Sequence, residues 1–164
     1  MVKEKEYRGV TMLDRALKEP GRLEAFLCEW TKGVWEGLSE MDEKTVKRIL
    51  RKSGEACARI WIDLYGYDPR LYDMDSYISA HDKKPGNRCK KEDDSILYEF
   101  KRKQCVCPLV SEGIVKLTPK LCSTCATNWF EFAFGIVAKG PVRAELIKSL
   151  ARGDKKCIFR IHLK

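Results

Sequence analysis

The sequence predicts an α+β fold, in which N-terminal helices precede an antiparallel sheet that packs against one long helix. Apolar residues recur at helical spacing through about the first 65 residues and alternate with polar ones later in the chain. The length of 164 residues fits one domain with its own core. We therefore expect a single domain over 1–164, divided into a mainly helical part at 1–82, a loop at 83–95 and a cysteine-containing α+β core at 96–164.

Two long helices are predicted first. The helix over 22–38 has one apolar face, made of Leu23, Phe26, Leu27, Trp30, Val34 and Leu38. The helix over 43–65 begins at a cap, Asp42 or Thr45, and ends in the Tyr65–Pro69 turn. Its predicted core face carries Val46, Ile49, Leu50, Ser53, Cys57, Ile60, Trp61 and Leu64. A further short helix is expected within 69–80.

Strands and one more helix follow. Alternation predicts a strand at 96–100, and a second short strand is expected at 114–117. Thr118 as cap and Pro119 at the first helical position mark the next helix start. The chain then ends in a hairpin, with strands at 142–146 and 157–163 joined through the turn Arg152-Gly153-Asp154.

The sequence contains no apolar run of about 18 residues, which predicts that the chain has no transmembrane helix. Its first residues mix both charge signs and lack the apolar stretch of a signal peptide. We therefore expect a cytoplasmic protein. In a reducing compartment, eight cysteines point to metal binding or redox chemistry rather than to a disulfide framework.

The net charge of +8 is unevenly distributed. Residues 83–103 carry 8 basic and 4 acidic side chains, and residues 139–164 carry 8 and 2, while residues 1–82 carry 14 and 16. Such an excess can attract an anionic partner or simply keep the surface solvated, and we favour the second interpretation. No aromatic residues are interleaved with the basic ones at 83–91, so a nucleic-acid partner is not expected.

Four cysteines form the main candidate site. Cys105 and Cys107 are followed, after 14 residues, by Cys122 and Cys125. Two short-spaced thiolate pairs can close a tetrahedral zinc site, with an iron–sulfur cluster as the less favoured cofactor. Cys57, on the core face of its helix, is an additional candidate ligand. Two alternatives stay open: reversible dithiol redox chemistry at Cys122 and Cys125, and simple packing of small buried thiols.

The catalytic candidates are Cys125, Cys122 and Glu131. The start of a helix and the nearby positive charges are expected to lower the pKa of both thiols. Glu131 lies within the aromatic segment 129–134 and is interpreted either as a solvent-facing residue or as a buried base. The remaining cysteines and histidines are assigned to packing, loops or solvent: Cys28, Cys89, Cys157, His81 and His162.

The C-terminal third also carries an ordered series of short motifs. They are Cys105-Val-Cys-Pro-Leu109, Leu121-Cys-Ser-Thr-Cys125, Trp129 with Glu131 and Gly135, Gly140-Pro-Val142, Glu145-Leu146, Ser149, Arg152-Gly-Asp154, Cys157 and Phe159-Arg-Ile161. Arg51–Arg59 adds a helical cysteine segment upstream. The pattern resembles small-molecule-binding domains of the 4-vinyl reductase type. It is especially similar to bacterial and archaeal proteins grouped with 2-aminothiazoline-carboxylate hydrolase.

This resemblance implies a fold similar to nitric-oxide-sensing domains and Golgi-transport tethering subunits. It also implies a pocket for an apolar small molecule, which would suit Trp129, Phe130, Phe132 and Phe134, and a homodimer formed through the helices at 22–38 and 43–65. The expected function is therefore small-molecule binding or sensing with a cysteine-bound metal, most simply a structural zinc. The alternatives are a small thiol-dependent hydrolase or redox enzyme, and a zinc-supported nucleic-acid binder.

Overall fold

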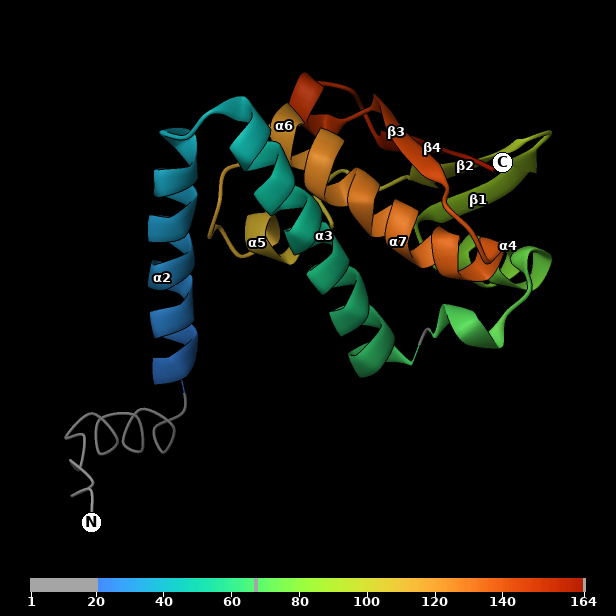
Figure 1. Cartoon of the computed structure of the whole chain (residues 1–164), viewed down its shortest axis with the longest axis horizontal. Helices are drawn as coiled ribbons and strands as arrows, with labels where there is room; N and C mark the ends of the chain where they lie inside the picture. The colour runs from blue at the N-terminus through green and yellow to red at the C-terminus, as the bar shows by residue number, and fades with distance from the viewer. Residues whose placement is uncertain (1–20, 67, 164) are drawn as a thin grey trace, which may run out of the picture. The chain divides into compact units, whose positions relative to one another are not determined.

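The computed structural model describes residues 21–66 and 68–163. It divides the chain into two compact units, Met1–Glu40 and Met41–Lys164, where the sequence led us to expect one domain. The second unit combines several helices with a four-stranded antiparallel sheet (Figure 1). The α+β fold class is therefore confirmed.

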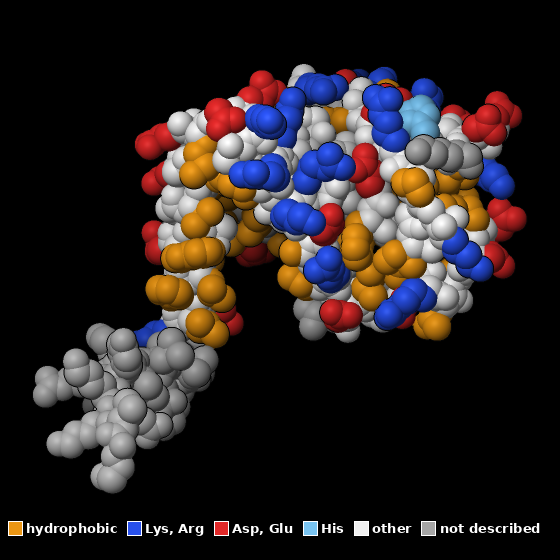
Figure 2. Space-filling model, viewed as in Figure 1, with side chains coloured by type: hydrophobic (Ala, Val, Ile, Leu, Met, Phe, Trp, Pro, Cys, Tyr) orange, Lys and Arg blue, Asp and Glu red, His pale blue; other side chains and the backbone are white. Residues whose placement is uncertain are grey.

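The described part of the first unit is a single helix, α2 (Arg22–Ser39), which matches the predicted bounds. Its apolar face is exposed: Phe26 and Trp30 are 62% and 60% accessible, and Leu23, Leu27 and Val34 are exposed beside them. Figure 2 shows these hydrophobic side chains along the helix. A face of this kind suits an interaction surface, and the homodimer through this helix stays a prediction.

The second unit opens with α3 (Glu43–Tyr65). Asp42 caps it by accepting a hydrogen bond of 2.9 Å from the Thr45 backbone N–H, as one of the two predicted caps. Gly66 ends it in the left-handed conformation, with φ of 67°. A short 3₁₀ turn, η1 (Pro69–Leu71), and α4 (Met74–Asp82) replace the single short helix expected within 69–80.

The sheet contains β1 (Asn87–Glu92), β2 (Ser95–Phe100), β3 (Arg143–Lys148) and β4 (Cys157–His162), in the order β1-β2-β4-β3. All neighbouring pairs are antiparallel. The expected loop at 83–95 is wrong at 87–92, where the chain forms β1. Only Cys89 is buried in that strand, so its charged residues conceal the alternation.

The core lies between the inner face of the sheet and α7 (Thr127–Ala138). Strand pairing places Cys89, Tyr98, Phe159 and Leu146 in one row across the sheet. Phe130 and Phe134 of α7 pack onto this row: the ring centroids of Phe130 and Phe159 are 4.6 Å apart, and those of Phe130 and Tyr98 are 4.9 Å apart. Close ring packing of this kind is typical of a well-packed protein interior.

The connection from the sheet to α7 differs from the sequence-based prediction more than the other segments do. After α5 (Pro108–Ser111) the chain forms no strand at 114–117, so that prediction is wrong. The Val115 N–H instead donates to the Leu109 carbonyl over 2.9 Å, which closes a loop around α5. Thr118 then caps α6 (Pro119–Leu121) as predicted. A π-helical turn, η2 (Cys122–Ala126), joins α6 to α7.

The π turn changes which side of α7 is buried. The face predicted for this helix contains Cys122, Cys125, Trp129, Phe132, Ala133, Ile136 and Val137. Of these, Cys122, Ala133 and Val137 are buried, whereas Trp129, Phe132 and Ile136 are only partly buried, and Phe130 and Phe134 lie in the core instead. A π turn adds about one residue to a helical turn and therefore rotates everything that follows it. This rotation accounts for the burial of Phe130 and Phe134, which the prediction missed.

His81 lies in the core rather than in a surface loop. Its side chain is 2% exposed, and Nδ1 lies 2.9 Å from the Tyr98 hydroxyl, which also accepts a hydrogen bond from Asn87. Burial, with a smaller contribution from Lys84, lowers the pKa of His81 to about 3. The ring is therefore neutral in the folded chain at neutral pH.

This neutral histidine predicts a loss of stability in acid. The folded pKa is about 3 and the unfolded one about 6.5, so the unfolded chain binds the proton first as the pH falls below 6.5. His81→Phe should remove up to about 1.4 kcal/mol per pH unit of this dependence between pH 6 and 4. Urea unfolding at several pH values measures it. His162→Gln, at the only other histidine, is the control and should retain the wild-type slope.

Candidate functional site

Three segments that are separate in sequence lie at one end of the sheet: the start of β4, the chain after β2 and the chain after β3. Cys157, the first residue of β4, pairs with Phe100, the last residue of β2. The chain that leaves β2 toward Cys105 and Cys107 therefore starts beside Cys157. Strand β3 also ends here, so Ser149 lies at the same end of the sheet. The antiparallel topology thus directs the chain after β2 toward Cys105, whose thiol is affected electrostatically by Cys157. The sequence analysis had assigned Cys157 to the core alone.

Helix α3 reaches the same region by packing on η2 and α7 (Figure 1). Gly54 lies directly over the Cys125 carbonyl: a Cβ atom at Gly54 would be 2.3 Å from that oxygen. The Asn128 side chain donates a 2.6 Å hydrogen bond to the Arg51 carbonyl, which fixes the register between the two helices. Cys57, one turn beyond Gly54, is thereby brought to Cys125.

Six cysteines lie in this region, and we call this group the thiol centre: Cys57, Cys105, Cys107, Cys122, Cys125 and Cys157. All six are free thiols in the structure. The pKa values of Cys57, Cys105, Cys122 and Cys125 are each affected by charge on other members of the group. The assignment of Cys105, Cys107, Cys122 and Cys125 as metal ligands, with Cys57 as an additional candidate, stays a prediction.

Burial dominates the acidity of the two thiols on η2. It raises the pKa of Cys125 to about 12, with further increases from Cys57, Cys107 and Cys122. It raises the pKa of Cys122 to about 11, with the Ser149 hydroxyl acting in the opposite direction. The expectation that a helix start and nearby lysines would lower these pKa values is wrong, because desolvation of the charged form outweighs both effects.

Burial is also the main influence on the pKa values of Cys57 and Cys105. Burial raises the pKa of Cys57, and the neighbouring Cys107 raises it further. Burial also raises the pKa of Cys105, although the Cys107 backbone N–H donates to this sulfur and opposes the increase. In the metal-free chain these sulfurs are therefore protonated near neutral pH.

No three or more His, Cys, Asp or Glu side chains are arranged to hold a metal ion within residues 21–66 and 68–163. The six sulfurs share one region, but as free thiols they do not form a ready-made coordination shell. The predicted zinc or iron–sulfur site therefore stays a prediction.

Glu131 has a structural position between three elements. Its Oε1 accepts a 3.1 Å hydrogen bond from the Ala144 backbone N–H on edge strand β3, and its Oε2 lies 3.6 Å from Arg51 on α3. The carboxylate is half-buried and occupied by these contacts. It joins α7 to its neighbours, and its predicted role as a base stays untested.

The four aromatic pocket candidates separate into two pairs. Phe130 and Phe134 are 2% and 0% exposed within the core, where other rings surround them. Trp129 and Phe132 are half-buried, and the Arg59 guanidinium lies 5.3 Å from the Phe132 ring centroid. The ligand pocket stays a prediction, and of the four only Trp129 and Phe132 retain accessible surface of note.

The remaining candidates lie elsewhere. Cys28 is on α2, in the other unit. Cys89 was expected in a polar loop but is buried in β1, where burial raises its pKa to about 12. His162 was expected to be solvated, but its Nε2 lies 3.0 Å from Glu145 Oε1. None of these three residues belongs to the thiol centre.

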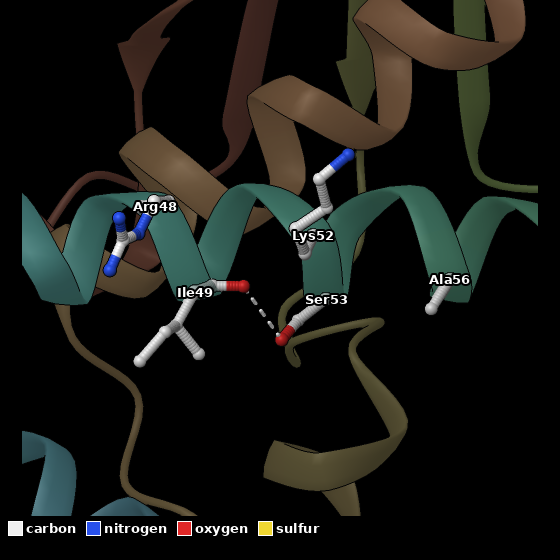
Figure 3. Close-up of a pocket in the computed structure, with 5 residues that line it drawn as sticks. All are labelled: Arg48, Ile49, Lys52, Ser53 and Ala56. Carbon is white, nitrogen blue, oxygen red and sulfur yellow. Dashed lines mark hydrogen bonds between the residues drawn. The ribbon is translucent and has the colours of Figure 1, made fainter.

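Two surface hollows are lined by residues other than the six cysteines of the thiol centre. The larger, of about 510 Å³, is lined along α3 by Arg48, Ile49, Lys52, Ser53 and Ala56 (Figure 3). The Ser53 hydroxyl is directed back to the Ile49 carbonyl at 3.1 Å, so it offers little to a ligand. The smaller hollow, of about 370 Å³, is lined by Glu92, Asp93, Asp94, Ser95, Arg160 and His162.

Basic side chains of the second unit are interspersed with acidic ones (Figure 2). Several cations of α3 have acidic partners: Lys47 with Glu43, Arg51 with Glu131, and both Lys52 and Arg59 with Glu55. This pairing agrees with a solvated surface more than with a continuous anion-binding one. No helix in the described part of the chain has both the length and the apolar character needed to cross a membrane.

Comparison with known proteins adds no relatives. No protein-family model matches the chain, and a search of curated proteins finds no match either. The resemblance to 4-vinyl reductase-type domains therefore stays a prediction from the motifs.

The contact at Gly54 predicts a large effect from a single methyl group. Gly54→Ala should destabilise the chain by about 1–3 kcal/mol, because the new Cβ would overlap the Cys125 carbonyl. Gly33→Ala on α2 is the control, since nothing lies within 4 Å of its Cβ position, and it should be neutral or stabilising by up to about 1 kcal/mol. Urea unfolding compares the two. Equal stability of the variants would contradict the close approach.

The raised pKa values of Cys122 and Cys125 predict slow alkylation of the metal-free chain. At pH 7.5 both should react at least about a hundredfold more slowly than an unperturbed thiol of pKa about 8.5, because the thiolate fraction falls tenfold per unit of pKa. Mass-spectrometric mapping after iodoacetamide treatment, with a cysteine peptide as reference, gives these rates. Fast reaction at either residue would support the thiol-dependent enzyme instead.

Proposed function

We propose that this chain is a small-molecule binding or sensing domain built around a cysteine-bound metal, with zinc as the ion. The observation that supports the proposal is the thiol centre, because free thiols from four parts of the chain influence one another's pKa values. The alternative, in which the cysteines serve only as small buried side chains, would not require six of them in one region.

The electrostatics of the thiol centre favour a cation. Desolvation and mutual repulsion are what oppose negative charge on these sulfurs. A divalent ion placed among them reverses both effects, because it neutralises several thiolates at once and replaces their protons. The same proximity that makes the free thiols poor nucleophiles therefore makes them suitable ligands.

A structural role fits the segments involved. Cys105 and Cys107 lie on an irregular stretch between β2 and α5, whereas Cys122 and Cys125 lie on η2. An ion held by both pairs would join this stretch to the helix that covers the sheet. Zinc needs four thiolates for such a closed site, and an iron–sulfur cluster would use the same residue type.

The small-molecule part of the proposal rests on the aromatic segment that follows the cysteines. Trp129 and Phe132 are half-buried, and they lie on the same helix that would be tied to the metal. A ligand bound against them would be sensitive to changes at the thiol centre. The thiol-dependent enzyme and the nucleic-acid binder are less favoured, because the η2 thiols are protonated and the α3 cations are paired.

Metal analysis tests the proposal directly. The full chain, purified anaerobically without an affinity tag, should contain at least one zinc per chain and show a featureless visible spectrum. Replacement of Cys105, Cys107, Cys122 and Cys125 by serine should abolish zinc binding and lower the melting temperature. Cys28→Ser is the matched control and should keep the metal, because Cys28 is not one of the six cysteines of the thiol centre and lies on α2, in the other unit.

Two results would refute the metal proposal. A wild-type chain that contains no metal and binds none on addition would leave the six thiols free. A quadruple variant as stable as the metal-loaded wild type would remove the structural role. Iron with acid-labile sulfide would replace zinc by the iron–sulfur alternative.

A further inference from the structure

One side of helix α2 is apolar and exposed to solvent (Figure 2). Five large residues that recur at helical spacing form this side and are between 39% and 62% exposed: Leu23, Phe26, Leu27, Trp30 and Val34. The adjacent side of the same helix differs, because Trp35 is half-buried and Leu38 is buried. A contiguous exposed apolar surface of this kind is typical of an interaction site.

The apolar side is large enough to hold a partner helix. Aromatic side chains carry about 150–250 Å² each, so the exposed parts of Phe26, Trp30 and the three aliphatic residues amount to about 500 Å². A second copy of the chain offers the same area again. Contact between the two would therefore bury about 1,000 Å² in total, which is near the smallest area of a specific interface.

Large and small residues lie at opposite ends of this side. Leu23 and Phe26 lie one to two turns before Trp30, whereas Gly33 and Gly37 lie one to two turns after it. Among the described residues, nothing lies within 4 Å of the position that a Cβ atom would take at either glycine. An antiparallel partner centred on Trp30 would lay its large residues over these glycines. A parallel partner would oppose large to large and leave gaps at the glycines.

The charges beside the apolar side favour the same direction. Arg22 lies at the start of α2, and Glu36 and Glu40 lie at its end, all three with exposed side chains. Antiparallel pairing brings each Arg22 to the end that carries the two carboxylates, whereas parallel pairing sets like charges together. Glu29, near the middle, has its own partner in Lys32 at 2.6 Å. The macrodipoles of the two helices are also opposed only in the antiparallel arrangement.

We propose that α2 pairs antiparallel with α2 of a second copy of this chain, with Trp30 of each subunit at the centre of the interface. Phe26 then packs over Gly33 of the partner subunit, and Leu23 packs over Gly37 of the partner subunit. The two-fold axis repeats each contact, so every favourable pair occurs twice. This inference concerns the first unit alone, and it does not depend on the metal binding proposed for the second unit.

The first test is sedimentation velocity of the full wild-type chain at concentrations from about 1 to 100 µM. A reductant is present, so that Cys28 cannot cross-link two chains. The sedimenting mass should rise with concentration toward twice that of one chain. Because this measurement uses the wild-type chain, it does not depend on any variant folding correctly.

A variant at the two-fold axis then locates the interface. Trp30→Glu should raise the dimer dissociation constant at least about a hundredfold, because it removes the central pair of rings and brings two carboxylates together. Leu71→Glu is the matched control, since Leu71 is 78% exposed outside α2, and it should leave the dissociation constant unchanged. Equal helical circular dichroism of both variants and the wild type verifies that the fold is intact.

A charge exchange tests the direction of pairing. Arg22→Glu should weaken the dimer about threefold to tenfold, because it sets acidic side chains against Glu36 and Glu40 of the partner subunit. Adding Glu36→Lys and Glu40→Lys to this variant should restore wild-type affinity.

Three results would overturn the proposal. A wild-type chain that stays monomeric at every concentration would show that a second copy does not cover this side of α2. A dimer that resists Trp30→Glu would place the interface elsewhere. A charge exchange that fails to restore affinity would overturn the antiparallel direction. None of these results bears on the metal content of the chain, so the proposed function is tested separately.

Discussion

The close approach of α3 to the π turn η2 determines how α3, which carries Cys57, lies against the segment that carries Cys122 and Cys125. Gly54 has no side chain, so the α3 backbone rests against the Cys125 carbonyl, and the Asn128 amide fixes the register through the Arg51 carbonyl. Cys57 reaches the later cysteines only because of this contact. A larger residue at position 54 would hold α3 further from the Cys125 backbone.

The π turn has a second consequence, which concerns the core. Its wider turn interrupts regular helical bonding, and the Thr127 hydroxyl compensates by donating to the Ser123 and Thr124 carbonyls at 3.0 and 3.1 Å. The helix then continues with its faces rotated. Phe130 and Phe134 then pack in the core against the sheet, with the Phe130 ring centroid 4.6 Å from that of Phe159. π turns are frequent at functional sites for this reason.

Burial and charge oppose each other at the thiol centre, and burial prevails in the metal-free chain. Basic residues are numerous near the cysteines in sequence, yet the thiols remain protonated because they are removed from water. Hydrogen-bond donors at Cys105 and Cys122 act in the opposite sense and lower these two pKa values. A bound cation would offset the cost of burying thiolates, and the hydrogen-bond donors would then stabilise the same charged form.

The sequence by itself determined the fold class, the bounds of α2, the caps of α3 and α6, and the final hairpin, because periodicity and capping are local properties. It also placed Cys105, Cys107, Cys122 and Cys125 in one candidate site through their spacing. Only the tertiary structure decided that Cys157 joins them, that Phe130 replaces Trp129 in the core, and that the thiols are protonated. Strand pairing, the π turn and desolvation depend on residues distant in sequence, so local patterns do not encode them.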